Sequence, residues 1–254
     1  MHDTAPYGAA IILNFLENNL EAKLFVVSTP IGNLKDITLR ALETLKDVDF
    51  IACEDTRVTG FLLSHYEIRK EMTSLNAVNE SSKINFILDK ILSGKNCALV
   101  SDAGTPGISD PGNRLINSAA EKGIAIIPVP GASALLTALT ISGLPTNSFV
   151  FEGFIPQKKG RQKKLLSLSS EERTIVIYES VHRIEKLLTE LNEFMPEREM
   201  VVCRELTKKF EELWKGKPSE LLSVLNTKNI KGEFVVVIAP KKWHANYDGH
   251  SSLS

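Results

Sequence analysis

The sequence predicts an α/β protein of two lobes with mostly parallel sheets. Short, continuously apolar runs such as LFVVS (24–28) and CALVS (97–101) alternate with amphipathic stretches along most of the chain. Such strands are typical of parallel sheets that carry helices on both faces. The length of 254 residues suits one large domain or two lobes of roughly 100–130 residues.

In the first half of the chain, strands and helices are expected in strict alternation. Asp36 is the expected N-cap of one helix, Gly94 ends another, and Asp110 with Pro111 opens a third as N-cap and first helical residue. The expected strands lie at 24–28, 48–53, 97–101 and 124–129, and the first two helices at 36–46 and 79–93.

The second half of the chain repeats this alternation of strands and helices, and the two ends of the chain depart from it. The PVPG segment at 128–131 predicts the boundary between the lobes, and we expect a flexible tail after residue 240. Strands are expected at 148–154, 173–178, 199–204 and 233–239, and helices at 132–142, 160–169, 180–194 and 218–226. The predicted division is an N-terminal extension 1–22, lobes 23–128 and 129–240, and a tail 241–254.

Composition narrows the class of protein. The formal net charge is −1, so any contact with nucleic acid has to come from local basic clusters. The three cysteines, Cys53, Cys97 and Cys203, lie in apolar runs and form no CxxC pair, which is typical of reduced thiols in a cytoplasmic protein. The histidines show no metal-ligand spacing, and no apolar run is long enough for a membrane span. The apolar patch at 9–13 has no basic region before it and is interrupted by Asn14 and Glu17, so it does not fit a signal peptide. We therefore expect a cytoplasmic protein without a metal.

The segments that follow the strands carry the chemistry, because α/β sheets bind ligands beyond the carboxyl ends of their strands. SDAGTPGISDPG (101–112) holds three glycines, two prolines and two aspartates, more than a chain reversal requires. Glycines let backbone amides approach a ligand, and prolines stiffen the loop. Neither a GxGxxG after the first strand nor a P-loop occurs. These features predict a small polar ligand with an adenosine-like part.

These motifs together resemble a known family. TPIGNLKDITLRALETLK, ACEDTR, ALVSDAGTPGISDPG, PVPGASALLTALTISGLP, FEGFIP, YES-HR and RELTK occur in this order between residue 24 and about residue 239. They are similar to the RsmI-type rRNA (cytidine-2′-O)-methyltransferases of the tetrapyrrole-methylase superfamily. The resemblance implies S-adenosylmethionine in the cleft between the lobes, a homodimer, and a ribose 2′-hydroxyl of 16S rRNA in the small ribosomal subunit as acceptor.

The resemblance also implies which residues hold the cofactor. They belong to the loops after the strands and to one strand end of the second lobe. The expected residues are Thr29, Pro30, Gly32, Asn33, Ser101, Asp102, Ala103, Gly104, Thr105, Gly131, Ser133, Ala134, Tyr178 and Glu179.

Two charged motifs supply the catalytic candidates. A ribose hydroxyl is a weak nucleophile, so a base or a cation beside the developing alkoxide should help the transfer. EDTR offers Glu54, Asp55 and Arg57, and RELTK offers Glu205 and Lys208. Asp55 is the first candidate for the proton and Glu205 the second. Ion pairs with a purely structural role explain both motifs equally well.

One local basic cluster, QKKGRQKK (157–164), predicts where RNA binds, although a solvated helix start explains it as well. Phe151 and Phe154 precede it and could stack on bases or pack in the core. The expected RNA-binding residues are Lys158, Lys159, Arg161, Lys163, Lys164 and Arg183.

Two other functions remain open at this point. One is a C-methyltransferase of the corrinoid or sirohaem pathway on the same fold, although such enzymes tend to have a GxGPGDP-like first loop where this chain has STPIGNL (28–34). The other is a non-catalytic RNA-binding module of ribosome assembly, which would bind subunits without methyl transfer.

Overall fold

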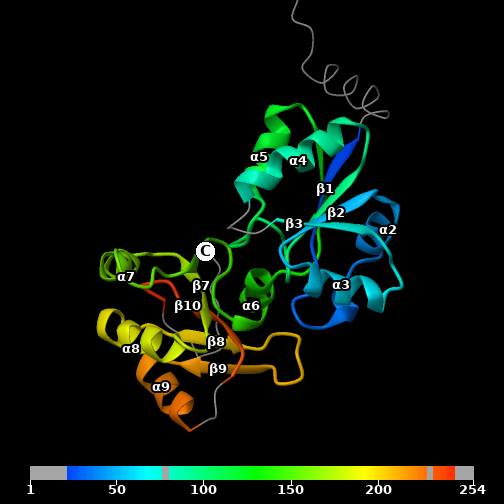
Figure 1. Ribbon diagram of the computed structural model, residues 1–254. Helices are drawn as coiled ribbons and strands as arrows, with labels where there is room; N and C mark the ends of the chain where they lie inside the picture. The colour runs from blue at the N-terminus through cyan, green and yellow to red at the C-terminus, as the bar shows by residue number, and fades with distance from the viewer. Residues whose placement is uncertain (1–21, 76–79, 228–230, 244–254) are drawn as a thin grey trace, which may run out of the picture. The chain divides into compact units, whose positions relative to one another are not determined.

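The computed structural model describes residues 22–75, 80–227 and 231–243. Within them the chain forms two compact units, one extending to Ala132 and the other beginning at Ser133 (Figure 1). Each unit contains one five-stranded sheet, and each is described by itself below.

The sheet of the first unit is entirely parallel among its described strands. Its order is β3-β2-β4-β1-β5, and every adjacent pair runs in the same direction. The carboxyl ends of all strands therefore meet at one edge. The strands are β1 (Lys23–Val27), β2 (Phe50–Cys53), β3 (Glu71–Ser74), β4 (Cys97–Val100) and β5 (Ala125–Val129).

Helices cover both faces of this sheet. α2 (Leu39–Asp47) and α3 (Thr56–His65) pack with one set of strand side chains, including Ile51 and Val100. α4 (Glu80–Leu92) and α5 (Asn113–Glu121) pack with the opposite set, including Phe50 and Leu99. Successive strand residues point to opposite faces, so continuously apolar strands bury both faces, as the sequence predicted.

The sheet of the second unit is mixed. Its order is β6-β7-β10-β8-β9, and among the described strands only β6 and β7 are parallel. The expectation of mostly parallel sheets is therefore wrong for this unit, because β10 inserts antiparallel between β7 and β8. The strands are β6 (Phe149–Phe154), β7 (Thr174–Ser180), β8 (Met200–Arg204), β9 (Glu212–Gly216) and β10 (Glu233–Ile238).

Most helices of the second unit lie on one face of its sheet. α7 (Arg161–Ser169), α8 (Ile184–Phe194) and α9 (Pro218–Asn226) contribute leucines and isoleucines to one core with Ile177 and Val202. α6 (Ala134–Ser142) instead contacts β10, and the Tyr178 hydroxyl accepts a hydrogen bond from the Leu135 amide at the start of α6.

Two expected helix starts are wrong. The N-cap of α2 is Thr38, whose hydroxyl accepts the Ala41 amide at 3.1 Å, while Asp36 ends a short 3₁₀ helix, η1 (Leu34–Asp36). α5 begins at Asn113 after Gly112, whose φ of 122° is accessible to glycine, so Asp110 and Pro111 stay in the preceding loop. Among the described residues, no helix is long and apolar enough to cross a membrane.

Candidate functional site

The loops after β1 and β4 are joined by a backbone bridge. Thr29 and Gly104 exchange both backbone hydrogen bonds, at 2.8 and 3.1 Å. The Thr29 hydroxyl also donates to the Ser101 carbonyl at 3.1 Å, and Ser101 itself is buried. Gly104 has a φ of 81°, a conformation that glycine adopts without strain. The segment 101–112, called the Gly/Pro loop below, is therefore held at the carboxyl edge of the parallel sheet.

The loop after β5 approaches the same edge. The Ser28 and Thr105 hydroxyls lie 2.9 Å apart, and Thr105 donates to the Ala132 carbonyl at 3.3 Å. A Cβ on Gly131 would lie 3.0 Å from the Cβ of Ser28, so a larger residue would press on Ser28. Ser28 carries no sequence signal of its own, because its hydroxyl contributes only once β1 and the 101–112 loop meet.

The remaining predicted cofactor residues of the first unit follow Thr29 in the loop after β1. Pro30 is buried, whereas Gly32 and Asn33 are exposed. The Asn33 side chain accepts the Lys35 amide at 3.1 Å, which turns the chain into η1. The geometry thus brings Thr29, Ser101–Thr105 and Gly131 together, as the motif order suggested.

Carboxylates gather where the loops after β2 and β4 meet. Asp102 Oδ1 accepts the Asp55 amide at 3.0 Å, which links EDTR to the Gly/Pro loop. Burial raises the pKa of Asp102. Burial also raises the pKa of Glu54, and the negative charges of Asp102 and Asp110 raise it further. Asp110 was expected only as a helix cap, whereas its charge acts on Glu54.

Asp55 has a different environment. Two nitrogens of the Arg57 guanidinium bind its carboxylate, at 2.5 and 3.1 Å, and the same carboxylate caps α3 by accepting the Arg57 amide at 2.8 Å. Hydrogen bonds from Arg57 lower the pKa of Asp55 to about 2. Asp55 is therefore a weaker proton acceptor than its neighbour Glu54.

RELTK forms a closed network in the second unit. Lys208 Nζ lies 2.8 Å from both Glu205 Oε1 and Glu233 Oε2, and Glu205 Oε1 also accepts the Glu233 amide at 3.0 Å. Arg204 pairs with Glu212 at 3.1 Å. Burial tends to raise the pKa of Glu205, but the hydrogen bonds from Lys208 and the Glu233 amide outweigh it and lower the pKa. These contacts give RELTK a structural role within its own unit.

The end of β7 holds a buried carboxylate. Glu179 is 1% exposed, and its Oε1 lies 2.7 Å from Arg183 Nε. Its Oε2 is buried and has no hydrogen-bond partner among the described residues. Tyr178, the preceding residue, joins β7 to α6 through Leu135, and α6 starts directly after Ser133, its N-cap.

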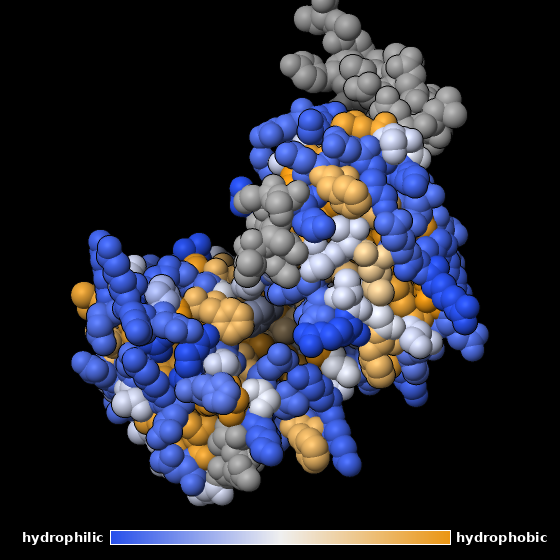
Figure 2. Space-filling view, in the orientation of Figure 1, coloured by the Kyte–Doolittle hydropathy of each residue, from blue (hydrophilic) through white to orange (hydrophobic). Residues whose placement is uncertain are grey.

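The predicted RNA-binding cluster is only partly at the surface. Lys158, Lys159 and Lys163 are exposed, and Lys164 pairs with Glu152 at 2.5 Å. Arg161 is 3% exposed and binds Glu190 of α8, which excludes it from the RNA-binding set. In Figure 2, the part of the second unit that carries α7 and α8 presents mainly hydrophilic side chains.

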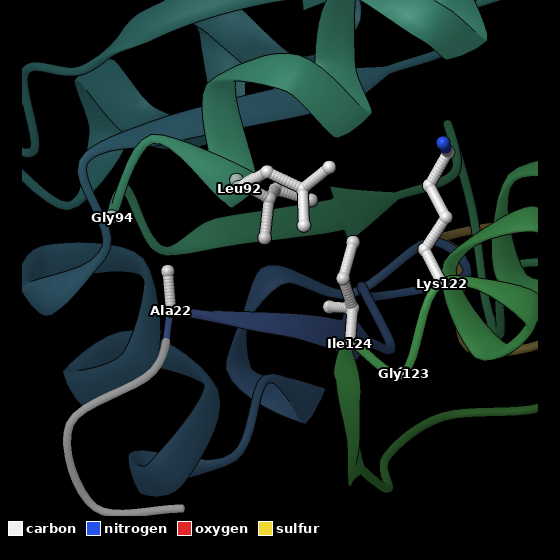
Figure 3. A pocket seen from close by; sticks show the side chains of 7 residues that line it. Ala22, Leu92, Gly94, Lys122, Gly123 and Ile124 are labelled. Carbon is white, nitrogen blue, oxygen red and sulfur yellow. The ribbon is translucent and has the colours of Figure 1, made fainter.

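Two other features lie outside the candidate site. A cavity of about 250 Å³ is lined by Ala22, Gly94 and Ile124, which precede β1, β4 and β5 (Figure 3), so it lies at the opposite edge of the first sheet from the motif loops. The described residues contain no group of three or more His, Cys, Asp or Glu that could hold a metal ion. Burial raises the pKa values of Cys97 and Cys203 to about 12, so neither thiol is a nucleophile.

Solved structures of low sequence identity show which fold the chain has. Diphthine synthase superposes with a TM-score of 0.71 at 16% identity, covering 88% of this chain and 92% of that one. Uroporphyrin III C-methyltransferase from Thermus thermophilus, complexed with S-adenosyl homocysteine, superposes with a TM-score of 0.62 at 16% identity, covering 86% and 97%. The fold is that of the tetrapyrrole methylases.

The sequence places the chain within that class. Residues 23–222 match the model of the tetrapyrrole (corrin/porphyrin) methylases, and the chain belongs to this family of S-adenosylmethionine-dependent methyltransferases. It is 50% identical over 218 residues to ribosomal RNA small subunit methyltransferase I of Synechocystis, covering 85% of this chain and 78% of the relative. The relative of the same name from Thermotoga maritima is 46% identical, covering 87% and 99%.

The described residues fit this cofactor. S-adenosylmethionine carries hydrogen-bond donors on its adenine, ribose and ammonium groups, and buried carboxylate oxygens need such donors. The orphaned Oε2 of Glu179 is one acceptor of this kind. Asp102, whose described hydrogen bond uses only Oδ1, offers another on the first unit.

Proposed function

We propose that this chain methylates the ribose 2′-hydroxyl of a cytidine in the 16S rRNA of the small ribosomal subunit. The observation that carries the proposal is the 50% identity to a ribosomal RNA small subunit methyltransferase I over 85% of the chain. The carboxylates at the edge of the first sheet support a reaction in which a hydroxyl must lose its proton. We also propose that the protein acts in the cytoplasm as a homodimer.

The chemistry is an in-line displacement. S-adenosylmethionine supplies an electrophilic methyl group on a sulfonium. When bound, this cofactor would allow a ribose oxygen to take the methyl group, with the electron pair of the broken S–C bond left on sulfur. The protein has to align donor and acceptor. The bridge between Thr29 and Gly104 and the contact between Ser28 and Thr105 support this role, because they fix the loops that we propose hold the cofactor.

We place the hydroxyl proton on Glu54. A useful general base has a pKa closer to the working pH than an ordinary carboxylate has, and the pKa of Glu54 is raised while that of Asp55 is lowered to about 2. In this scheme Asp55 caps α3 and holds Arg57, whose exposed guanidinium is available to a phosphate. Glu205 and Lys208 stabilise the second unit and take no part in proton transfer.

The exposed lysines before and within α7 are proposed to bind RNA phosphates. Lys158, Lys159 and Lys163 carry no described ion pair, and their charges are therefore available. Each phosphate contact releases counterions, so affinity should fall steeply with salt. Replacing all three lysines with glutamine should flatten this dependence.

One experiment tests the proposal directly. Purified small ribosomal subunits are incubated with the protein and tritiated S-adenosylmethionine, and the labelled nucleoside is identified after nuclease digestion. The expected product is 2′-O-methylcytidine. Label on a base would place the acceptor elsewhere, binding to subunits without label would favour a non-catalytic assembly module, and transfer only to an added tetrapyrrole would favour C-methylation.

A further inference from the structure

An aromatic side chain stands exposed at the carboxyl end of β6. Phe154 is 50% exposed, although it ends a strand of the second sheet. Most large apolar side chains at strand positions are buried. The protein holds this ring at the surface at the end of the sheet that also carries Tyr178 and Glu179.

A β-bulge places the ring there. The pairing of β6 with β7 shifts register between Phe151 and Gly153, which leaves Glu152 as the extra residue. Gly153 has a φ of 58°, where a glycine is favoured. Bulges of this kind redirect side chains and are frequent beside functional sites. Without the shift, Phe154 would occupy the other face of its strand.

The ring is supported from within the unit. The rings of Phe151 and Phe154 both meet the Tyr178 ring edge-on, with centroids 4.9 and 5.9 Å away. Tyr178 is itself anchored to α6 through its hydroxyl. Phe154 is therefore a rigid surface rather than a mobile apolar side chain.

An arginine lies against the same ring. The Arg183 guanidinium carbon is 5.6 Å from the Phe154 centroid. The described side-chain contacts of Arg183 with polar groups use Nε, to Glu179 Oε1 at 2.7 Å and to Ser180 Oγ at 3.3 Å. None of them uses Nη1 or Nη2. The buried Glu179 carboxylate thus fixes the guanidinium and leaves its two terminal nitrogens for a ligand.

We propose that Phe154 and Arg183 form a docking platform for one unstacked nucleotide of the RNA substrate, with the base stacked on Phe154 and its phosphate bound by Arg183. Proteins that bind single-stranded RNA combine aromatic stacking with cationic phosphate contacts. A guanidinium with two free nitrogens matches a phosphate in a bidentate manner. Glu179 acts here as a positioning residue for Arg183. The platform rests on the proposed function, since it presumes an RNA substrate.

The first test measures stacking without methyl transfer. A single-stranded oligoribonucleotide that carries 2-aminopurine loses fluorescence when its base stacks on an aromatic ring. Phe154→Leu should weaken binding about tenfold and abolish the quenching, while Phe154→Trp should keep both. Phe149→Leu is the matched control, because Phe149 is an exposed phenylalanine at the other end of β6. Equal affinity and quenching for Phe154→Leu and the wild type would overturn the platform.

The second test separates the charge from the ring. Arg183→Gln should reduce the slope of log affinity against log salt by about 0.7, the value for one phosphate of a single strand, whereas Phe154→Leu should leave the slope unchanged. Lys186→Gln is the control, since Lys186 is an exposed cation of α8 nearby in sequence. Identical slopes for Arg183→Gln and Lys186→Gln would remove Arg183 from the platform.

The two proposals fail differently. Wild-type protein that binds and quenches the oligoribonucleotide but transfers no methyl group to RNA would refute the proposed function and leave the platform standing. Methyl transfer to RNA with a KM that Phe154→Leu does not change would refute the platform and leave the function standing.

Discussion

EDTR in the first unit and RELTK in the second both place opposite charges at the end of a strand, but the surroundings of their carboxylates differ. Each motif lies at the end of a strand; EDTR contains two carboxylates and one cation, whereas RELTK contains one carboxylate and two cations. In RELTK, Lys208 lies between Glu205 and Glu233 and forms an ion pair with each. In EDTR, Arg57 is bound to Asp55 alone, while Glu54 faces the charges of Asp102 and Asp110. The carboxylate of RELTK is therefore paired with a cation of the same motif, whereas EDTR lies where negative charge is concentrated.

This difference shows that the partners of a charged motif come from other segments. Asp102 reaches EDTR from the loop after β4, and Glu233 reaches RELTK from β10. A motif whose charges are compensated stabilises its unit. A motif whose carboxylates remain uncompensated can exchange a proton, which favours EDTR as the reactive one.

The largest expected effect is on catalysis at Glu54. Glu54→Gln removes the proposed proton acceptor, so turnover should fall about 10²- to 10⁴-fold, the usual contribution of general acid–base catalysis. Cofactor affinity should stay within about twofold. Steady-state methyl transfer and calorimetric titration with S-adenosylmethionine measure the two quantities.

Glu43→Gln is the control for this prediction, because Glu43 is an exposed carboxylate of α2. Unchanged turnover for Glu54→Gln would exclude Glu54 as the base. A parallel loss of activity and folded protein would instead indicate a structural role.

A glycine beside RELTK provides the next test. Gly232 has a φ of 101°, and a Cβ there would lie 2.4 Å from Cγ and Cδ of Glu205. Gly232→Ala should therefore lower the free energy of unfolding by about 2–4 kcal/mol, through backbone strain and displacement of Glu205. Urea unfolding measures this change.

Gly143→Ala separates the two causes. Gly143 also has a positive φ, 66°, but nothing lies within 4 Å of its Cβ position. If both variants lose the same free energy, the strain alone accounts for the loss and the contact with Glu205 contributes nothing.

Removing the central cation of RELTK should have a smaller effect. Lys208→Met leaves Glu205 and Glu233 without their partner and should cost about 1–2 kcal/mol at neutral pH, since the pair is partly exposed. The lowered pKa of Glu205 contributes stability that is present above the ordinary glutamate pKa and is lost as pH falls through the folded value. The variant should lose less stability than the wild type on acidification. Parallel curves of unfolding free energy against pH would contradict this account.

The smallest effect is a gain in stability in the first unit. Asp102 has a raised pKa because of burial, so its ionisation costs stability as pH rises through the folded value. Asp102→Asn keeps an oxygen for the Asp55 amide and removes this cost. We expect a small rise in melting temperature at pH 7 that disappears in acid. Asp89→Asn, an exposed residue of α4, should show no such rise, and a lower melting temperature for Asp102→Asn would contradict the assignment.

The sequence was sufficient to predict most central strands and the helices between them. β3, β9 and the helix α3 were not predicted. β3 (EMTS) and β9 (ELWKG) lack a continuous apolar run, whereas the other two edge strands, β5 and β6, are mostly apolar. The antiparallel entry of β10 also escaped, since strand direction depends on the path of the chain rather than on composition. Asp36 has the side chain of a cap, but Thr38 lies two residues closer to the helix and caps it.

The candidate site could be predicted only in outline. The loops were visible from their glycines and prolines, yet which residues they bring together was not. The raised pKa of Glu54 depends on burial and on the charges of Asp102 and Asp110, both about 50 residues further along the chain. In the sequence Arg161 belongs to a basic cluster, whereas in the structure it is buried and forms an ion pair with Glu190 of α8.

The bridge between Thr29 and Gly104 has a consequence for how this sequence can change. The bridge pairs Thr29, the second residue after β1, with Gly104, the fourth residue after β4. A deletion or insertion between Val100 and Gly104 would therefore shift Gly104 out of register. The segment behaves as an extension of the sheet, with a length that is fixed to the residue. Its amide protons at Thr29 and Gly104 should exchange with solvent as slowly as those of a strand, and length variation in related chains should fall elsewhere.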